Sequence, residues 1–517
     1  MRLGRARSVG LSGVRGTVVD IEAHIGGMPG FSMVGLPDTS LVEARDRVRA
    51  AILTSGETWP LQRITVSLSP ASMPKRGSYF DLGIAVAILE ADEQLPAGAG
   101  GDIVFFGELS LDGRLRAVRG VLPAVLAGSK AGLSRVVVPE ANAAEARLIP
   151  GVSVLGARSL SQVLAALRGL PMPEEPPDPP AAGPEPVTAG LQALDMADVA
   201  GQGEAKRGVE IAAAGHHHLM LGGVPGAGKT MLARRLPGLL PDLSADESLE
   251  VTAIHSVAGV LPPHQPLVTR PPFAEPHHTA STAAVVGGGS RQIRPGAASI
   301  AHRGVLFMDE APEFSISVLD ALRQPLENGE LVVSRLEATI TFPARFLLVL
   351  AMNPCRCGYH GSRHRDCTCS PDAVRRYWQR ISGPIRDRID VRIQIDPPAI
   401  ASLDAGLAAA ESTKVVAERV LAARERQSRR LAGTPWRVNG EVPGPHVRRH
   451  LMPPGRALGP LHESFSKGVL TARGADRALR VAWTIADLAG HDAPTRDDVA
   501  EAVSYRLGSS GSHDRLS

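Results

Sequence analysis

The sequence predicts two α/β domains followed by a helical domain. Strand-like and helical runs alternate on both sides of a proline-rich stretch, and short apolar runs in the second set end in phosphate-binding motifs. The remainder, 412–507, is rich in alanine, leucine and arginine at helical spacing. The predicted boundaries are 1–170 for the first domain, 171–190 for a linker, 191–400 for the second domain and 411–507 for the helical domain.

Local patterns predict the elements of the first domain and the linker. Residues 171–190 contain eight prolines and four acidic residues, a composition that prevents helix formation and core burial. Before them, alternating runs predict strands and apolar residues at helical spacing predict helices. The predicted strands are 16–25 and 64–68, and the predicted helices are 41–55, 82–91 and 122–131.

Composition limits how the chain can bind nucleic acid or a membrane. Its 56 basic and 53 acidic residues give a net charge of +3, and only 3% of the residues are aromatic. A nucleic-acid contact would therefore be local and would use arginine and backbone groups more than base stacking. The basic start is not followed by an apolar core segment with a cleavage site, and no run of about 18 apolar residues occurs. We expect a cytoplasmic protein with no membrane partner.

A glycine-rich loop follows the apolar run 218–221. Residues 223–230, GVPGAGKT, fill the pattern G-x-x-x-x-G-K-[ST] between a predicted strand and a predicted helix. In such a loop backbone N–H groups surround a polyphosphate, Lys229 reaches the terminal phosphates and Thr230 ligates magnesium. A chance glycine-rich turn is the alternative. The predicted ATP-binding residues are Gly223, Val224, Pro225, Gly226, Ala227, Gly228, Lys229 and Thr230.

Two acidic residues end a second apolar run, GVLFMDE at 304–310. Their position predicts that Asp309 lies beside the magnesium ion and that Glu310 orients the attacking water. A surface strand could also end in two acids by accident. The phosphate loop that precedes them makes the functional interpretation the stronger one.

Further motifs extend over almost the whole chain. They include VDIEAHIGGMPGFSMVGLPD at 19–38, PHHTAS at 276–281, VGGGS at 286–290, MNP at 352–354 and RID at 388–390. With the phosphate loop, they resemble the AAA+ ATPases, specifically the magnesium-chelatase-like branch and its ComM (YifB) family, which is linked to natural transformation. The resemblance implies a P-loop AAA+ core that forms a homo-hexameric ring, hydrolyses ATP with Mg²⁺ and migrates DNA branches as a helicase.

The resemblance also implies roles for three residues beside Asp309 and Glu310. Asn353 matches the sensor that hydrogen-bonds the γ-phosphate or its water. Arg388 matches the finger that reaches the neighbouring subunit's nucleotide, with Arg386 as an alternative. Arg473 matches the second sensor, which links nucleotide state to the helical lid. A solvated helix face or a salt bridge between subunits is the alternative for Arg388 and Arg473.

Two insertions supply candidate DNA contacts. In the resembling ATPases, excursions such as 262–303 and the predicted hairpin 331–342 face the ring pore. Their arginines could follow a DNA backbone, because such contacts depend on phosphate charge; a subunit contact is the alternative. The candidates are Arg291, Arg294 and Arg335.

A second basic region lies in the predicted helical domain. Residues 411–450 contain nine lysines and arginines against four glutamates. Arginines at this density could bind phosphates, whereas Glu and Arg pairs on a solvated helix are the alternative. The arginines concerned are Arg419, Arg424, Arg426, Arg429 and Arg430.

All four cysteines lie in one short segment, as two C-x-C pairs separated by nine residues. Four thiolates at this spacing can close a tetrahedral zinc site that orders a loop with few apolar residues. Reduced free thiols or a redox disulfide are the alternatives, and His360 and His364 are substitute ligands. The predicted zinc ligands are Cys355, Cys357, Cys367 and Cys369.

The first domain resembles the Lon-protease-like fold, through runs such as FDLGIA at 80–85 and GELSLDG at 107–113. A Lon-like peptidase needs a serine activated by a lysine, and the positions that match this dyad fall near Tyr79 and Leu122. Ser78 and Lys75 lie close in sequence but read as turn residues. We therefore expect a non-catalytic domain that binds DNA or a partner.

Two functions agree with these patterns. The first is an ATP-driven ring motor that acts on branched or single-stranded DNA, in recombination or natural transformation. The second is a chelatase-like or chaperone-like ATPase that remodels a protein partner without binding DNA. Both use the same nucleotide chemistry, so the phosphate loop does not distinguish them, and the family resemblance favours DNA.

Overall fold

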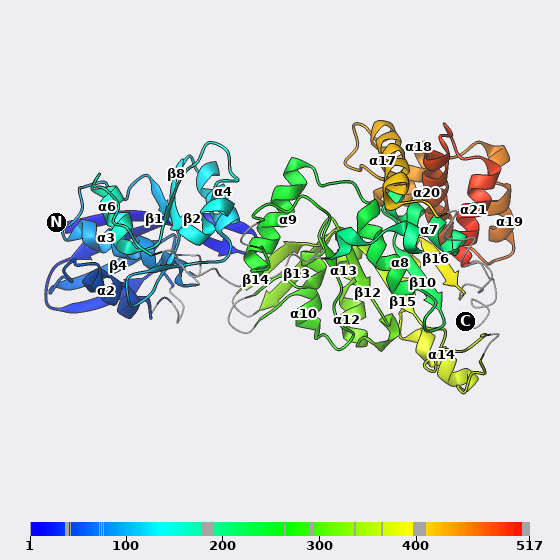
Figure 1. The fold of residues 1–517 in the computed structure, drawn as a ribbon, viewed down its shortest axis with the longest axis horizontal. Helices are drawn as coiled ribbons and strands as arrows, with labels where there is room; N and C mark the ends of the chain where they lie inside the picture. Colours follow the sequence, from blue (N-terminus) through cyan, green and yellow to red (C-terminus); the bar gives the residue numbers. More distant parts are fainter. Residues whose placement is uncertain are drawn as a thin grey trace.

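The computed structural model describes residues 2–36, 41, 43–71, 73, 75, 77–176, 190–262, 265–289, 293–335, 338–362, 365–396 and 410–508. Figure 1 shows an N-terminal α/β region, a central α/β region and a C-terminal group of helices that packs beside the central one. The two large sheets combined with helices confirm the α/β class. Every helix within the described ranges is too short or too polar to cross a membrane.

The N-terminal region is built on a seven-stranded sheet. Its strands are β1 (Arg2–Ser12), β2 (Arg15–Ile25), β3 (Gly30–Val34), β4 (Arg63–Ser69), β5 (Ile103–Phe105), β8 (Arg135–Pro139) and β9 (Ser153–Ala157). They lie in the order β3-β4-β2-β1-β5-β8-β9, with β1 and β2 as a long antiparallel hairpin and β5, β8 and β9 parallel. The minor strands are β6 (Glu108–Leu109) and β7 (Leu115–Arg116).

Helices cover this sheet because their apolar residues need burial. The run DLGIAVAILEA forms α3 (Asp81–Ala91), in which every residue except Glu90 is buried. Helix α4 (Val121–Lys130) packs on β1 and β2 and also reaches the central region. The remaining helices are α2 (Ala44–Thr54), α5 (Ala143–Ala146) and α6 (Leu160–Leu167), with short 3-10 turns η1 (Ser78–Phe80) and η2 (Glu140–Asn142).

The central region is a five-stranded parallel sheet. Its strands are β10 (Leu219–Gly223), β11 (Phe273–Ala274), β12 (Val305–Met308), β15 (Leu347–Met352) and β16 (Val391–Ile395). The order β11-β12-β15-β10-β16 places β10 between β15 and β16. Runs such as LLVLAM are buried throughout, as expected for strands with helices on both faces. Residues that follow β10, β12 and β15 therefore meet at one edge of the sheet.

Helices and one hairpin surround the central sheet. The predicted hairpin is confirmed as β13 (Glu330–Arg335) paired with β14 (Ala338–Pro343). The helices are α7 (Gly203–Gly215), α8 (Lys229–Arg235), α9 (Ala245–Ala258), α10 (Thr282–Val286), α11 (Ala297–Ile300), α12 (Ile316–Ala321), α13 (Arg323–Asn328), α14 (Pro371–Gln379) and α15 (Gly383–Arg388). The 3-10 turns are η3 (Leu191–Ala193), η4 (Met196–Asp198), η5 (Leu236–Leu239) and η6 (Ala311–Glu313).

The C-terminal helices share a hydrophobic core with the central sheet. Residues of α7, β10 and β16 pack in one cluster with residues of α17, α20 and α21. These helices begin at Ser412, Thr471 and Thr495, whose side chains accept hydrogen bonds from the first turn. The helices are α17 (Thr413–Arg430), α18 (Gly444–His450), α19 (Gly459–Ser466), α20 (Ala472–Ala489) and α21 (Arg496–Leu507), with η7 (Asn439–Glu441) and η8 (Gly455–Ala457).

Candidate functional site

The loop 223–230 connects β10 to α8. Gly226 (φ +79°) and Gly228 (φ +94°) have left-handed backbone angles that residues with a side chain rarely adopt. A Cβ atom on Gly223 would lie 2.4 Å from the carbonyl oxygen of Ile395. The backbone therefore requires glycine at these positions, and the turn leaves N–H groups at the start of α8 available to a phosphate.

Lys229 lies in the turn and is largely buried. Its Nζ atom donates to the carbonyl oxygens of Gly223 at 2.6 Å and Val224 at 3.0 Å, and to Oδ1 of Asn353 at 3.0 Å. Burial lowers the pKa of Lys229, and the two carboxylates that follow β12 act against this shift. The structure thus brings the lysine of the loop into contact with the predicted sensor at the end of β15.

The acidic pair after β12 meets the same loop. The Thr230 hydroxyl donates to Oδ2 of Asp309 at 2.7 Å, and Oδ1 of Asp309 accepts from the backbone N–H of Glu310 at 2.9 Å. A hydroxyl and a carboxylate oxygen so close together suit a hard cation such as Mg²⁺, which prefers oxygen ligands.

Glu310 has an unusual backbone conformation and a histidine partner. Its φ of +51° is uncommon for a residue with a side chain, and the side chain is exposed. Nδ1 of His278, in the loop after β11, lies 3.2 Å from Oε2 of Glu310. Sequence reasoning missed this residue: His278 belonged to a stretch that carried the family resemblance, but no spacing rule connects it with Glu310.

Two further contacts support the phosphate loop from outside. Nε2 of Gln202 donates to the carbonyl oxygen of Ala227 at 2.7 Å. On the other side, Gly358 packs so closely that its Cβ atom, if present, would lie 2.6 Å from Cγ of Pro225. Both contacts bridge distant parts of the sequence, and neither was predicted.

The two predicted arginines lie near each other and not in the phosphate loop. Arg388, at the end of α15, forms an ion pair with Glu327 and donates to the Pro384 carbonyl oxygen at 2.6 Å. Burial lowers the pKa of Arg388, and the positive charges of Arg477 and Arg473 lower it further. Arg473 is exposed in the first turn of α20.

A buried carboxylate connects this arginine region to the C-terminal helices. Arg477, one turn after Arg473, donates to the Arg388 carbonyl oxygen at 2.9 Å and to Oδ1 of Asp390 at 2.6 Å. Nδ1 of His217 lies 3.0 Å from the other oxygen of Asp390. Burial alone would raise the pKa of Asp390, but the surrounding arginine charges and His217 hold it well below its ordinary range. Asp390 is therefore ionised.

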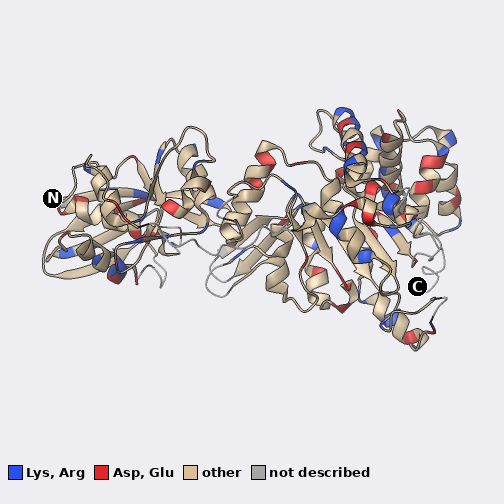
Figure 2. Ribbon diagram, in the orientation of Figure 1, with Lys and Arg blue, Asp and Glu red and all other residues tan. Residues whose placement is uncertain are grey.

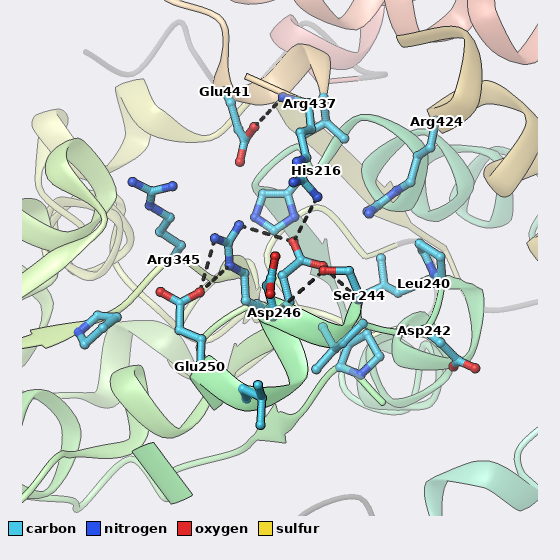
Figure 3. Close-up of a pocket in the computed structure, with 18 of the residues that line it drawn as sticks. His216, Leu240, Asp242, Ser244, Asp246, Glu250, Arg345, Arg424, Arg437 and Glu441 are labelled. Atoms are coloured by element: carbon cyan, nitrogen blue, oxygen red, sulfur yellow. Dashed lines mark hydrogen bonds and ion pairs between the residues drawn. The ribbon is translucent and has the colours of Figure 1, made fainter. Parts of the chain in front are cut away.

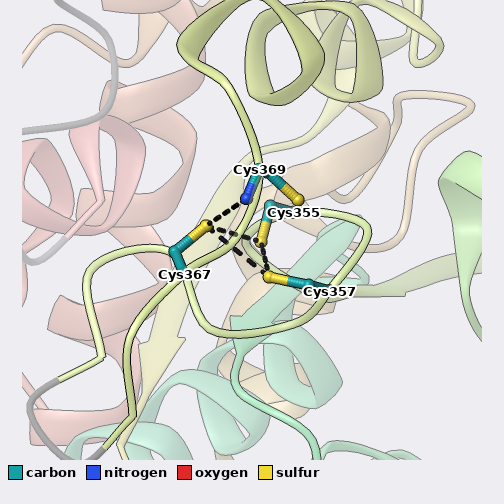
Figure 4. Close-up of side chains that lie close together, drawn as sticks. All are labelled: Cys355, Cys357, Cys367 and Cys369. Atoms are coloured by element: carbon teal, nitrogen blue, oxygen red, sulfur yellow. Dashed lines mark hydrogen bonds between the residues drawn. The ribbon is translucent and has the colours of Figure 1, made fainter.

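The four cysteine side chains converge in the loop after β15 (Figure 4). The Sγ atom of Cys355 lies 3.2 Å from that of Cys357 and 3.6 Å from that of Cys367, and all four Sγ atoms lie within 4.8 Å of one another. The Tyr359 backbone N–H is the main cause of a lowered pKa at Cys357. Sulfur atoms at these distances fit a tetrahedral Zn²⁺ site, in which Zn–S bonds are about 2.3 Å.

Comparison with known proteins shows the family. Three family models match: "Magnesium chelatase, subunit ChlI" over 195–403, "Subunit ChlI of Mg-chelatase" over 19–142, and "Magnesium chelatase, subunit ChlI C-terminal" over 410–506. The chain is 51% identical over 514 residues to an uncharacterised protein of Mycobacterium tuberculosis, covering 98% of this chain and 99% of the relative. It is 44% identical over 497 residues to YifB of Escherichia coli and 41% identical over 499 residues to "Competence protein ComM" of Haemophilus influenzae, each covering 96% of this chain and 95% of the relative.

The chain belongs to the ComM/YifB family. The central parallel sheet and the matched chelatase models agree with the magnesium-chelatase-like AAA+ class that the sequence motifs indicated. The match over nearly the whole length includes the N-terminal and C-terminal regions as well as the central sheet.

The basic helix of this ComM/YifB chain uses its arginines internally. Nε of Arg419 donates to Glu210 on α7 at 2.7 Å, and Nη2 of Arg424 donates to the Ala213 carbonyl oxygen at 2.6 Å. Figure 2 shows basic and acidic residues interleaved along α17. These contacts favour the structural alternative for the stretch. Of the remaining arginines, Arg426 donates to the Asp487 carbonyl oxygen on α20 and Arg430 to the Asp487 carboxylate, whereas Arg429 donates to the Glu425 carbonyl oxygen.

The predicted DNA contacts of the family insertions are only partly described. Arg294 is exposed at the end of the excursion that precedes α11. Arg335 ends β13, but its side chain is not among the described ones. Arg291 and His364 lie outside the described residues.

Ser78 and Lys75 of the N-terminal region do not form a dyad. The Ser78 hydroxyl donates to Glu108, whereas the fully buried Nζ of Lys75 donates to the Pro70 carbonyl oxygen. Burial lowers the pKa of Lys75. Each group thus has a different partner.

A cavity of about 1010 Å³ is lined by residues outside the loop 223–230, 18 of which are drawn in Figure 3. Residues of α4, α9, the loop before α9 and α17 line it, and its ionic wall includes the Arg303 ion pairs with Glu247 and Glu250 at 3.5 and 3.2 Å. The residues that line this cavity are thus distinct from Lys229, Thr230, Asp309 and Asn353.

Proposed function

We propose that this chain is an ATP-hydrolysing AAA+ ring motor that acts on DNA. One observation carries the proposal: Lys229 contacts Asn353, and Thr230 contacts Asp309, at the edge of the sheet where β10, β12 and β15 end. A cation, a metal-ligating pair and a polar amide that converge beside an N–H-rich loop suit a nucleoside triphosphate with Mg²⁺.

Each residue has a distinct role in this proposal. The N–H groups of 223–230 and Lys229 bind the phosphates, and Thr230 with Asp309 holds Mg²⁺, which neutralises phosphate charge when bound. Glu310 orients the attacking water, and Asn353 hydrogen-bonds the γ-phosphate or that water. His278 holds the Glu310 carboxylate in place, so we regard it as a positioning residue.

The neighbouring subunit completes the site in a homo-hexamer. Arg388 and Arg473 lie near each other beside the C-terminal helices, and Arg388 contacts Glu327 and the Pro384 carbonyl oxygen, both outside the phosphate loop. Guanidinium groups that make no contact with the phosphate loop of their own chain are available to the γ-phosphate of an adjacent copy. A positive charge there stabilises the transferring phosphoryl group.

The four cysteines would hold Zn²⁺ as a structural ion. Four thiolates leave no open coordination position, so the ion would fold the loop and take no part in hydrolysis. The close approach of Gly358 to Pro225 makes this loop a support for the phosphate loop.

DNA is the proposed track because the Haemophilus influenzae relative is named a competence protein, and competence is the uptake of DNA. Helicase activity and branch migration are proposed on the same basis. The alternative remains an ATPase that remodels a protein partner.

The test is ATP turnover with and without forked and four-way DNA. We expect DNA to raise the rate and Glu310→Gln to bind ATP and assemble while turnover falls at least 100-fold, the scale of a lost catalytic group. Undiminished turnover in Glu310→Gln would contradict its role. ATP hydrolysis that is insensitive to every DNA form, with no salt-dependent DNA binding, would favour the protein-remodelling alternative.

A further inference from the structure

A small apolar cluster joins the N-terminal region to the two insertions of the central region. Its buried members are Ile293, Ile340 and Phe342, and Val14 and Val333 pack against them. Val14 lies at the turn between β1 and β2, Ile293 in the excursion before α11, and the others on the β13–β14 hairpin. Figure 1 shows the end of the β1–β2 hairpin beside β14. The N-terminal region is thus fixed directly to both elements that carry candidate DNA contacts.

A second set of contacts fixes the orientation of the N-terminal region. The backbone N–H of Gly120 donates to the Ser256 carbonyl oxygen of α9 at 3.3 Å. Helix α4 begins directly after Gly120, and the Leu122 N–H in its first turn donates to Glu145 at 2.8 Å. Arg119 packs against Gly259, where an added Cβ atom would be 2.3 Å from Nε of Arg119. The position of the Arg119 guanidinium is therefore set by packing.

Three arginines flank this joint, and each adjoins a residue that anchors it. Arg15 follows Val14, Arg294 follows Ile293, and Arg119 precedes Gly120. All three side chains are exposed, and none of them has an ion-pair partner or a side-chain hydrogen bond in the structure as described. The arginines of α17 differ from these three, because each of them has a hydrogen-bond partner within the chain.

The positive charge of Arg294 disfavours the cationic form of Arg119. Burial lowers the pKa of Arg119, and the positive charge of Arg294 lowers it further, with no carboxylate acting in the opposite direction. Like charges brought together across a joint of two regions are unfavourable unless an anion separates them. A phosphate group meets that need, because guanidinium groups bind it through charge-assisted hydrogen bonds.

We propose that Arg15 and Arg119 of the N-terminal region, together with Arg294 of the insertion, form one continuous surface that contacts the phosphate backbone of DNA. The proposal rests on the DNA-directed function above and gives the N-terminal region a part in it. Contacts of this kind carry no sequence preference, so the surface holds DNA of any sequence at the entrance to the insertions.

The test compares single Ala variants of Arg15, Arg119 and Arg294, and the triple variant, with Arg135→Ala as a matched control. Arg135 is an exposed arginine of the same region without an ion pair, at the start of β8 and away from the joint. DNA affinity is measured for the full chain with a fluorescent forked duplex at 50 to 200 mM salt. Thermal melting shows that each variant is folded.

Each phosphate contact contributes about 0.9 to the slope of log affinity against log salt concentration. Over this fourfold salt range, each phosphate contact therefore accounts for about a 3.5-fold change in affinity, and this change disappears when the contact is lost. We expect each single variant to lower the slope by about 1 and the triple variant by 2 to 3, whereas Arg135→Ala keeps the wild-type slope. Arg119→Lys, which retains the charge, should restore most of it.

The outcomes separate this inference from the proposed function. Wild-type slopes in all three variants, with DNA binding intact in the unaltered chain, would overturn the surface and leave the motor in place. Absence of DNA binding in the unaltered chain would overturn both. A smaller slope in Arg135→Ala equal to that of Arg119→Ala would show a general charge effect and would also overturn the surface.

Discussion

Gly358→Ala tests whether the cysteine loop supports the phosphate loop. The new Cβ atom would lie 2.6 Å from Cγ and 2.7 Å from Cδ of Pro225, about 0.8 Å short of ordinary contact. The proline is rigid and belongs to the phosphate loop, so either that loop or the cysteine loop has to move. Gly361→Ala is the matched control: Gly361 lies in the same segment at φ +75°, and its added Cβ would meet no atom within 4 Å.

The two variants share one cost and differ in the other. Both place a side chain at positive φ, since Gly358 has a φ of +89°, and this costs about 1–2 kcal/mol. Only Gly358→Ala adds an overlap, which costs about 1–3 kcal/mol in a packed region. If about 1.4 kcal/mol of that cost falls on the conformation that binds nucleotide, the dissociation constant for ATP rises about tenfold.

The assay is titration of each purified variant with a fluorescent ATP analogue, beside thermal melting. Both variants should melt below wild type, and Gly358→Ala alone should lose about tenfold in nucleotide affinity. Equal ATP affinity in the two variants would refute the idea that the cysteine loop sets the position of the phosphate loop, whatever their melting temperatures.

Three further outcomes follow from the site. His278→Ala should lower kcat about tenfold with little change in KM, because Glu310 loses the partner that positions it, and His278→Asn should recover part of the rate; an unchanged kcat would argue against this role. Asp390→Asn should destabilise the fold by about 3 kcal/mol at pH 7, because it removes the buried counter-charge of the partly buried Arg477. The pKa of Asp390 in the folded protein is depressed from 3.8, so the stability that its ionised form contributes is complete above about pH 4 and is lost as the pH falls. Denaturant unfolding should therefore show that the difference in free energy of unfolding between wild type and Asp390→Asn becomes smaller in acid. A zinc chelator should lower both melting temperature and ATP affinity, as Cys369→Ser should; metal analysis without zinc in fresh protein would contradict this.

Local patterns were enough to predict many elements. The predicted strand 16–25 corresponds to β2, and the predicted helix 82–91 corresponds to α3 within one residue at its start. Both runs have a strong period or an unbroken apolar composition, which few alternative structures satisfy. The phosphate loop and the acidic pair were found because each motif is contiguous and ends a strand.

Contacts between distant segments were not predictable in the same way. The spacing of the arginines on α17 did not distinguish DNA contact from ordinary ion pairing. The structure gives Arg419 a partner, Glu210, that lies 209 residues away in the sequence. The pair of His278 with Glu310 depends on β11 and β12 lying side by side. The joint around Ile293 depends on the docking of a whole region. No local periodicity encodes such distances, because they are set by how the sheets and helices pack.

In the proposed ring motor, the same packing connects hydrolysis to motion. Arg477 holds the backbone of Arg388 and the side chain of Asp390 from one guanidinium, and Arg473 stands one turn earlier on the same helix. A shift of α20 would therefore move Arg388 and Arg473 together, since a helix behaves as a rigid element. If these arginines contact the nucleotide of the next subunit, release of phosphate there removes an attraction that acts directly on α20. The buried, ionised Asp390 then connects α20 to the start of β16, so the change at α20 is passed on to the central sheet.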